Sequence, residues 1–239
     1  MRKYKSRPRK SSLNLEDFNM EQNSIINFNE PLVPRYPKIQ TKLVYAFKDG
    51  RPLTLDLITP PLLPNVKAHF PLLIYVPDVD EHNMVKSDER FAQMLEISKR
   101  GYAVALISYR TNSDVTAMVK DIHSATRFLL DHAFKYELDP YRYLLFGEGL
   151  GGYLSSLSIL EQGQQRSNDE DVRRSPLRYK GGVLLETSLT PQPFSGPFLS
   201  ELLLQNTQKF PPLLILNGTA DNTLTDKQAT ELLSTIQSR

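Results

Sequence analysis

Short apolar runs recur along the chain, and the segments between them are long enough to form helices. Five of these runs have the length and content of strands buried on both faces: PLLIYV (71–76), YAVALISY (102–109), YLLF (143–146), GGVLLET (181–187) and PLLILNG (212–218). Between two of them, residues 114–134 place apolar side chains on one helical stripe. Strands that alternate with helices favour a mostly parallel sheet with helices on both faces. We therefore predict one α/β domain.

Residues that favour turns and helix ends indicate where the other expected strands and helices begin and end. The Asp-Gly pair of KDGRP predicts a hairpin between strands 39–47 and 53–58. A helix is expected to end at Gly101, and Asp139-Pro140 predicts a turn before the strand 143–146. Thr225 and Gln228 have the spacing of a capping box, which predicts a last helix.

The two ends of the chain differ in character. MRKYKSRPRK carries six Lys or Arg, and we expect residues 1–38 to be a poorly ordered basic and polar extension. The alternative is a basic arm that binds phosphate backbones or anionic lipid heads. Residues 39–239 would form the domain, with a short cap-like insertion at about 188–210.

Composition excludes several classes of site and partner. The 239 residues carry a net charge of +2 and no cysteine, which argues against nucleic-acid binding and excludes disulfides and a cysteine nucleophile. No apolar run approaches the ~18 residues that a membrane-spanning helix needs, and no secretory signal is evident. We expect a cytoplasmic protein that contacts no membrane and needs no cofactor.

The stretch LLFGEGLGGYLSS (144–156) is typical of a strand, a tight turn and the start of a helix. It has the form of a nucleophile elbow, G-x-S-x-G, except that Gly149 stands at the serine position. Its glycines also match a dinucleotide fingerprint, but that motif should follow the first strand of a βαβ unit, and this one follows several strands. Ser155 and Ser156 lie one to two turns into the helix, away from the apex of the turn.

From about residue 39 to 237 the chain resembles the esterase and lipase branch of the α/β-hydrolase superfamily. The matching pieces run in family order: LTLDLITPP, PLLIYV, GYAVALISYR, DPYRYLLFGEGLGG and PPLLILNGTADNTL. The resemblance implies an α/β-hydrolase fold that lacks the family's last strand and helix. It also implies that the strand 212–218 is the sheet edge, where we expect self-association, coverage by the N-terminal segment or poor solubility.

The resemblance also assigns positions in the site. Gly149 takes the nucleophile position without a side chain, and Glu148 matches the residue that often precedes the serine. Of the two oxyanion donors, the N–H of Leu150 is expected to remain. The other would come from the loop Pro77-Asp78-Val79-Asp80, where proline has no N–H and the carboxylates of Asp78 and Asp80 repel an oxyanion.

Asp221 matches the acid of the triad, whereas the histidine that serves as base has no counterpart, because the family places it after one further strand. His82 is the only histidine in a loop at the functional edge. Asp78, Asp80, Glu81 and His82 also form a set that could bind a divalent metal, although a solvated acidic loop is the simpler interpretation, and we predict no metal site.

Three residues outside the elbow are expected to be structural. The pair Tyr109-Arg110, which follows a strand and matches a family element, should bridge loop carbonyls or a carboxylate. Asp121 should face solvent or form a local ion pair.

Without nucleophile and base, a serine hydrolase loses about a million-fold in turnover. The sequence therefore predicts a non-catalytic module that binds a small molecule in the former cleft or a protein. The alternative is a carboxylic-ester hydrolase, of the esterase, lipase or peptidase-like kind, seen in a mutated or truncated form.

Overall fold

A computed structural model of the chain describes residues 36–62, 68–80, 90–111, 113–164, 175–187 and 211–218, with a few single residues and short stretches between 82 and 234. Contacts divide the chain into two units, Met1–Val33 and Pro34–Arg239. The first unit lies outside the described residues, so the predicted character of the N-terminal extension stays a prediction.

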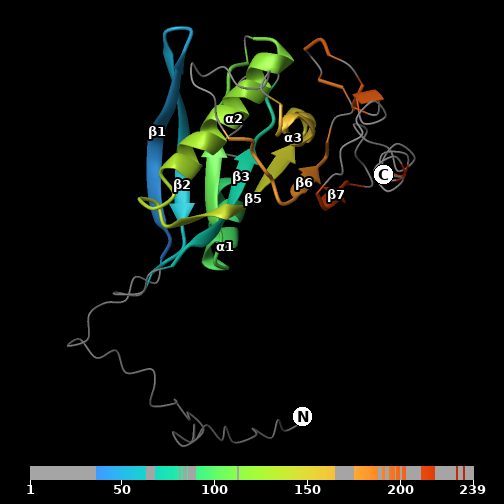
Figure 1. Cartoon of the computed structure of the whole chain (residues 1–239). Coiled ribbons are helices and arrows are strands. Elements are labelled where there is room, and N and C mark those ends of the chain that lie inside the picture. Colours follow the sequence, from blue (N-terminus) through green and yellow to red (C-terminus); the bar gives the residue numbers. More distant parts are fainter. Residues whose placement is uncertain are drawn as a thin grey trace, which may run out of the picture. The chain divides into compact units, whose positions relative to one another are not determined.

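Seven strands form one sheet in the order β1-β2-β4-β3-β5-β6-β7 (Figure 1). Their bounds are Lys38–Lys48 (β1), Arg51–Thr59 (β2), Phe70–Val76 (β3), Ala103–Ile107 (β4), Leu138–Glu148 (β5), Gly182–Leu185 (β6) and Leu213–Leu216 (β7). β1 and β2 form the predicted hairpin, and β2 pairs antiparallel with β4. The strands from β4 to β7 are parallel, so their carboxyl ends meet at one edge.

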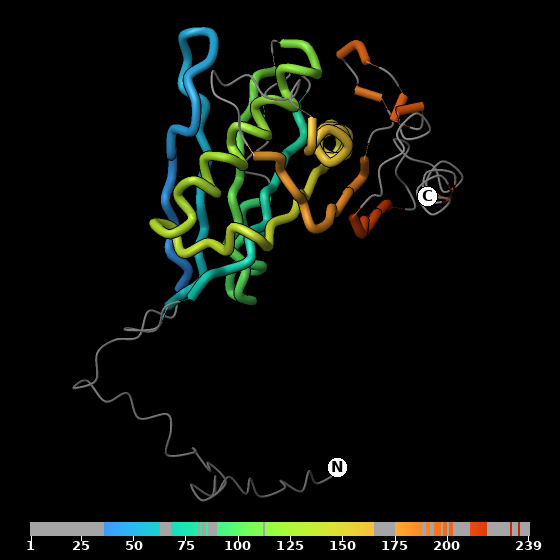
Figure 2. The backbone as a smooth tube through the Cα atoms, viewed as in Figure 1, coloured from blue at the N-terminus to red at the C-terminus, as the bar shows by residue number. Residues whose placement is uncertain are grey.

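The predicted cover of helices on both faces is confirmed by the side chains of the sheet. Leu72 and Ile74 face a large core cluster with α2 (Val115–Asp131) and α3 (Leu150–Glu161). The alternate residues Leu73 and Tyr75 face a smaller cluster with Met94 of α1 (Phe91–Lys99). The tube in Figure 2 shows α2 and α3 on the near side of the sheet.

One expectation about element limits needs correction. β5 begins at Leu138 and therefore includes the Asp139-Pro140 pair that was expected to form a turn. Phe70 pairs with Leu138, and the register then shifts before Leu72 pairs with Tyr143. This irregularity accommodates a proline, which has no N–H for the ladder.

The strand β7 pairs with β6 and has no second neighbour among the described residues. The side chains of Leu214 and Leu216 are 53% and 42% exposed, so this edge carries apolar surface. Self-association through residues 212–218 and the absence of a further strand stay predictions. The expected last helix and most of the cap-like insertion lie outside the described residues. None of the described helices is long and apolar enough to cross a membrane.

Candidate active site at the elbow

The elbow is formed where β5 ends and α3 begins. Gly149 joins the two elements with φ 54° and ψ −119°, a conformation that is strained for residues with a side chain. Its N–H donates to the carbonyl oxygen of Leu185 at 3.0 Å, and its own carbonyl oxygen accepts from the N–H of Gly152 at 3.1 Å. The turn therefore has the sharp geometry of a nucleophile elbow, with glycine at its apex.

Close packing behind the apex of the turn explains why residue 151 is also a glycine. A Cβ atom on Gly151 would lie 2.1 Å from the carbonyl oxygen of Val76 and 2.5 Å from that of Pro77. Both atoms belong to the backbone and cannot move aside as a side chain would. The first turn of α3 thus lies directly against the end of β3, and this contact places the elbow beside the loop that follows β3.

The Asp78 carboxylate from that loop lies at the elbow. The N–H of Leu150 donates to Asp78 Oδ1 at 2.9 Å. A Cβ atom on Gly149 would lie 2.3 Å from Asp78 Cγ and 2.4 Å from Oδ2. The Leu150 N–H was expected to remain as an oxyanion donor; it is present, and in this structure it is bonded to Asp78.

The loop is fixed around Asp78. Tyr109, which follows β4, donates its hydroxyl to the carbonyl oxygen of Pro77 at 2.8 Å. Val79 forms an isolated antiparallel bridge with Val85 and packs against the core. Burial, reinforced by the charge of Asp78, raises the pKa of the Tyr109 hydroxyl, so the phenol stays a neutral donor.

Glu148 lies on the other side of the apex and accepts hydrogen bonds from two further elements. Tyr75 of β3 donates its hydroxyl to Glu148 Oε2 at 2.5 Å. Arg90 Nε lies 2.9 Å and 3.1 Å from the two carboxylate oxygens, and Arg90 Nη2 also bonds to Oε1. The hydrogen bond to Glu148 raises the pKa of the Arg90 guanidinium. Glu148 therefore ties the elbow to β3 and to the start of α1.

The remaining candidates lie apart from this group or outside the described residues. Asp221 and Glu81 lie outside the described residues. His82 donates its N–H to Asp80 Oδ1 at 2.9 Å within the loop. Among the described residues, no group of three His, Asp or Glu side chains could hold a metal ion. The hydroxyls of Ser155 and Ser156 are buried within α3, as expected from their distance along the helix.

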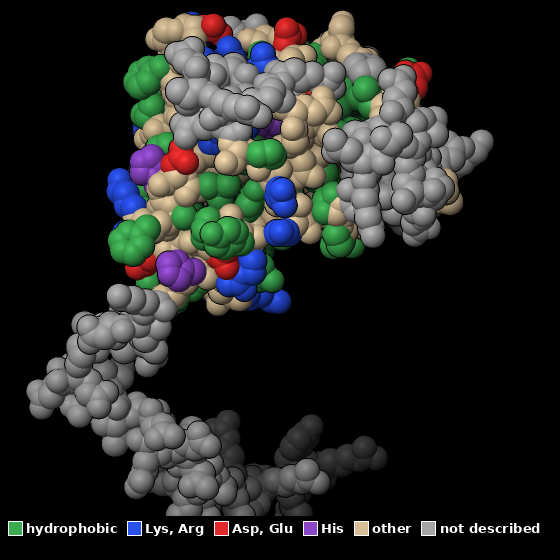
Figure 3. Space-filling view, in the orientation of Figure 1, with side chains coloured by type: hydrophobic (Ala, Val, Ile, Leu, Met, Phe, Trp, Pro, Cys, Tyr) green, Lys and Arg blue, Asp and Glu red, His purple; other side chains and the backbone are tan. Residues whose placement is uncertain are grey.

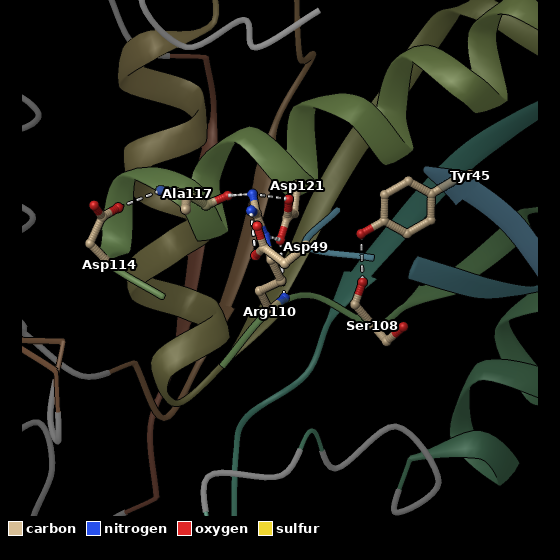
Figure 4. A network of polar contacts seen from close by, with 7 residues as sticks. All are labelled: Tyr45, Asp49, Ser108, Arg110, Asp114, Ala117 and Asp121. Atoms are coloured by element: carbon tan, nitrogen blue, oxygen red, sulfur yellow. Dashed lines mark hydrogen bonds and ion pairs between the residues drawn. The ribbon is translucent and has the colours of Figure 1, made fainter. Parts of the chain in front are cut away.

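The network around Arg110 confirms the predicted bridge to a carboxylate and, for Asp121, the ion-pair alternative (Figure 4). Arg110 Nε and Nη2 donate to the two carboxylate oxygens of Asp121 at 2.9 Å and 2.8 Å, and Nη1 reaches Asp49 Oδ2 at 3.1 Å. Asp121 is fully buried, so it is an ion-pair partner and does not face solvent. Arg110 thus joins the β1–β2 hairpin to α2.

The predicted bridge from Tyr109 to a loop carbonyl is confirmed by its bond to Pro77. Sequence reasoning missed Tyr75 and Arg90 as contributors to the site. Tyr75 was counted as a member of a buried strand, and Arg90 was not considered. A hydroxyl within a buried apolar strand is itself a signal, because such a group requires a hydrogen-bond partner.

Comparisons with known proteins give a methylesterase and several esterases. A probable isoprenylcysteine alpha-carbonyl methylesterase of Arabidopsis thaliana is 33% identical over 78 residues, which are 32% of this chain and 16% of the relative. The chain thus spans a small part of that relative's length.

Solved structures with a similar fold include esterases of two bacteria. Esterase 2 of Thermogutta terrifontis, phosphoramylated by tabun, matches with a TM-score of 0.70 and 18% identity over 89% of this chain and 82% of the other. Esterase B of Lactobacillus rhamnosis matches with a TM-score of 0.67 and 21% identity over 88% and 74%. At these identities the likeness shows the fold alone.

A family model described as BD-FAE matches residues 55–181, a range that runs from β2 past β5, the elbow and α3. The match covers more than half of the sequence. The chain has the α/β-hydrolase fold and belongs to the BD-FAE family of its esterase branch.

Proposed function

We propose that the chain carries the site of a carboxylic-ester hydrolase in a form that lacks the serine nucleophile. The family and the esterases of similar fold support the ester-hydrolase part of this proposal. They favour it over a module that serves only to bind a ligand or a protein.

The observation that carries the proposal is the conformation of Gly149. Its φ of 54° and ψ of −119° hold the turn between β5 and α3 in the form that exposes a nucleophile, yet no side chain is present. A glycine relieves the strain that a serine would have at this position. The geometry is therefore that of a catalytic turn, whereas the group that would attack an ester carbonyl is absent.

Ester hydrolysis by the serine mechanism needs an oxygen nucleophile at this apex and a backbone N–H that stabilises the oxyanion. The Leu150 N–H lies in position for the second role when Asp78 does not hold it. We assign the acid role to Asp221, on the family pattern alone.

The test is restoration of the nucleophile. We expect the wild-type chain to hydrolyse nitrophenyl acetate no faster than a heat-denatured control. The assay contains imidazole as an external general base, because no histidine of the chain is assigned that role. Under these conditions the variant Gly149→Ser/Asp78→Ala should exceed the matched control Gly149→Ala/Asp78→Ala at least tenfold, because only the serine supplies an attacking oxygen. Equal rates in the two double variants would contradict the proposal.

A binding module is the second candidate function, and the Asp78 contact favours it. A carboxylate that occupies the site in place of a nucleophile is compatible with recognition without chemistry. This candidate predicts saturable binding of ethyl butyrate by the wild-type chain without turnover, measured by calorimetry. An absence of binding heat would contradict a function in which the chain binds a small ester.

A further inference from the structure

We propose that Asp78 and Gly149 are a coupled pair: the Asp78 carboxylate fills the space that a side chain at residue 149 would need, and it holds the Leu150 N–H away from any other oxygen. This inference rests on the proposed function for its meaning, since the Leu150 N–H has an oxyanion to stabilise only in an ester hydrolase. The contact itself is tested independently of any activity.

The first argument is steric. Three atoms of the Asp78 carboxyl group, Cγ, Oδ2 and Oδ1, lie 2.3, 2.4 and 2.6 Å from the position of a Cβ atom on residue 149. Carbon and oxygen atoms that are not bonded to each other do not approach below about 3 Å. A side chain at residue 149 and the Asp78 carboxylate in its present position therefore exclude each other.

The second argument is electrostatic. Leu150 is the first residue of the 12-residue helix α3, where the N–H groups have no partner within the helix. The helix dipole favours an anion at this end. Asp78 Oδ1 accepts the Leu150 N–H at 2.9 Å, so the carboxylate takes the donor that would otherwise face a reacting oxyanion.

The third argument is that the neighbouring backbone holds Asp78 in this position. The Tyr109 hydroxyl donates to the carbonyl oxygen of Pro77 on one side, and the Val79–Val85 bridge lies on the other. The backbone of Pro77 is also in contact with the first turn of α3, as shown by the lack of space at Gly151. Opening the elbow therefore requires the Asp78 side chain to rotate away and to give up the Leu150 N–H.

The experiment is a double-mutant cycle on stability. Gly149→Ala is made in the wild-type, Asp78→Ala and Asp80→Ala backgrounds, and urea unfolding is measured for each. The positive φ of residue 149 makes alanine costly in all three. The clash with the carboxylate adds a cost only where Asp78 is present.

We expect Gly149→Ala to lower the folding equilibrium constant at least tenfold more in the wild-type and Asp80→Ala backgrounds than in the Asp78→Ala background. Asp80 is the matched control, because it is an acidic residue of the same loop that accepts the N–H of His82. Effects that are equal within twofold in all three backgrounds would overturn the inference.

Hydrogen exchange of the Leu150 amide is a second readout. Asp78→Ala should speed exchange at this amide at least tenfold relative to Asp80→Ala, and an unchanged rate would also overturn the inference. The two proposals fail in different ways. In the imidazole assay, coupling without turnover in Gly149→Ser/Asp78→Ala would contradict ester hydrolysis alone, whereas turnover in that variant without coupling would contradict the coupled pair alone.

Discussion

At the scale of single residues, the site depends on carboxylates that come from different parts of the chain. Glu148 is 9% exposed and accepts hydrogen bonds from Tyr75 and Arg90, which come from β3 and the start of α1. A buried charge of this kind stabilises the fold only while its partners are in place.

Removing the charge of Glu148 tests this dependence. We expect Glu148→Gln to lower the free energy of unfolding by about 2 kcal/mol, because the bond from Tyr75 can remain while the ion pair with Arg90 is lost. Urea denaturation measures the change. The control is Arg142→Gln, which breaks the more exposed pair with Asp139 and should cost less than about 1 kcal/mol. Equal costs would show that the Glu148 pair is no more than a surface ion pair.

The positions of Gly149, Leu150 and Asp78 were readable from the sequence, whereas their contacts were not, and neither was the contribution of Tyr75 and Arg90. The elbow motif located Gly149, and family order located the loop with Asp78. The bond between Asp78 and Leu150 joins residues 72 positions apart, and local patterns carry no signal over that separation. The rotamer of Asp78, which decides whether the Leu150 N–H is available, follows only from the packed structure.

At the scale of elements, the contact between α3 and β3 sets the position of the elbow. The helix approaches so closely that Gly151 has no space for a Cβ atom beside the carbonyl oxygens of Val76 and Pro77. The strands and helices between β3 and α3 were predictable, because apolar runs alternate with helical stripes along this part of the sequence. The exception is the start of β5, where a proline was taken as a turn although the strand continues through it with a register shift.

Adding a side chain to Gly151 at this contact should destabilise the fold. We expect Gly151→Ala to lower the free energy of unfolding by about 3 kcal/mol, since either α3 or the β3 end must shift. Gly163, just after α3, has no heavy atom within 4 Å of its Cβ position, so Gly163→Ala should change stability by less than about 1 kcal/mol. Thermal unfolding of the two variants measures the difference, and similar midpoints would contradict the close approach.

At the scale of the whole molecule, the described core contains several buried tyrosines. Burial raises the pKa of Tyr153 to about 12, and it also raises the pKa of Tyr109, Tyr143 and Tyr179. On the face seen in Figure 3, by contrast, hydrophobic, charged and polar side chains are interspersed.

These shifts predict a loss of stability at high pH. An unfolded tyrosine releases its proton near pH 10, whereas the folded core retains it, so the unfolded state binds fewer protons above that pH. The free energy of unfolding should therefore fall as pH rises from about 10 to 12, by about 1.4 kcal/mol per pH unit for each such tyrosine. Tyr153→Phe should make this fall less steep by about 1.4 kcal/mol per pH unit. A slope that Tyr153→Phe does not alter would contradict the burial of this phenol.

The account depends on an elbow that keeps its shape without a nucleophile. The most direct measurement is the intact mass of the wild-type chain after incubation with paraoxon, an organophosphate that phosphorylates activated serine in esterases. We predict no increase in mass, because residue 149 offers no oxygen and the Asp78 carboxylate beside it is bonded to Leu150. An increase by one diethyl phosphate group on any residue of 77–80 or 147–156 would contradict the account.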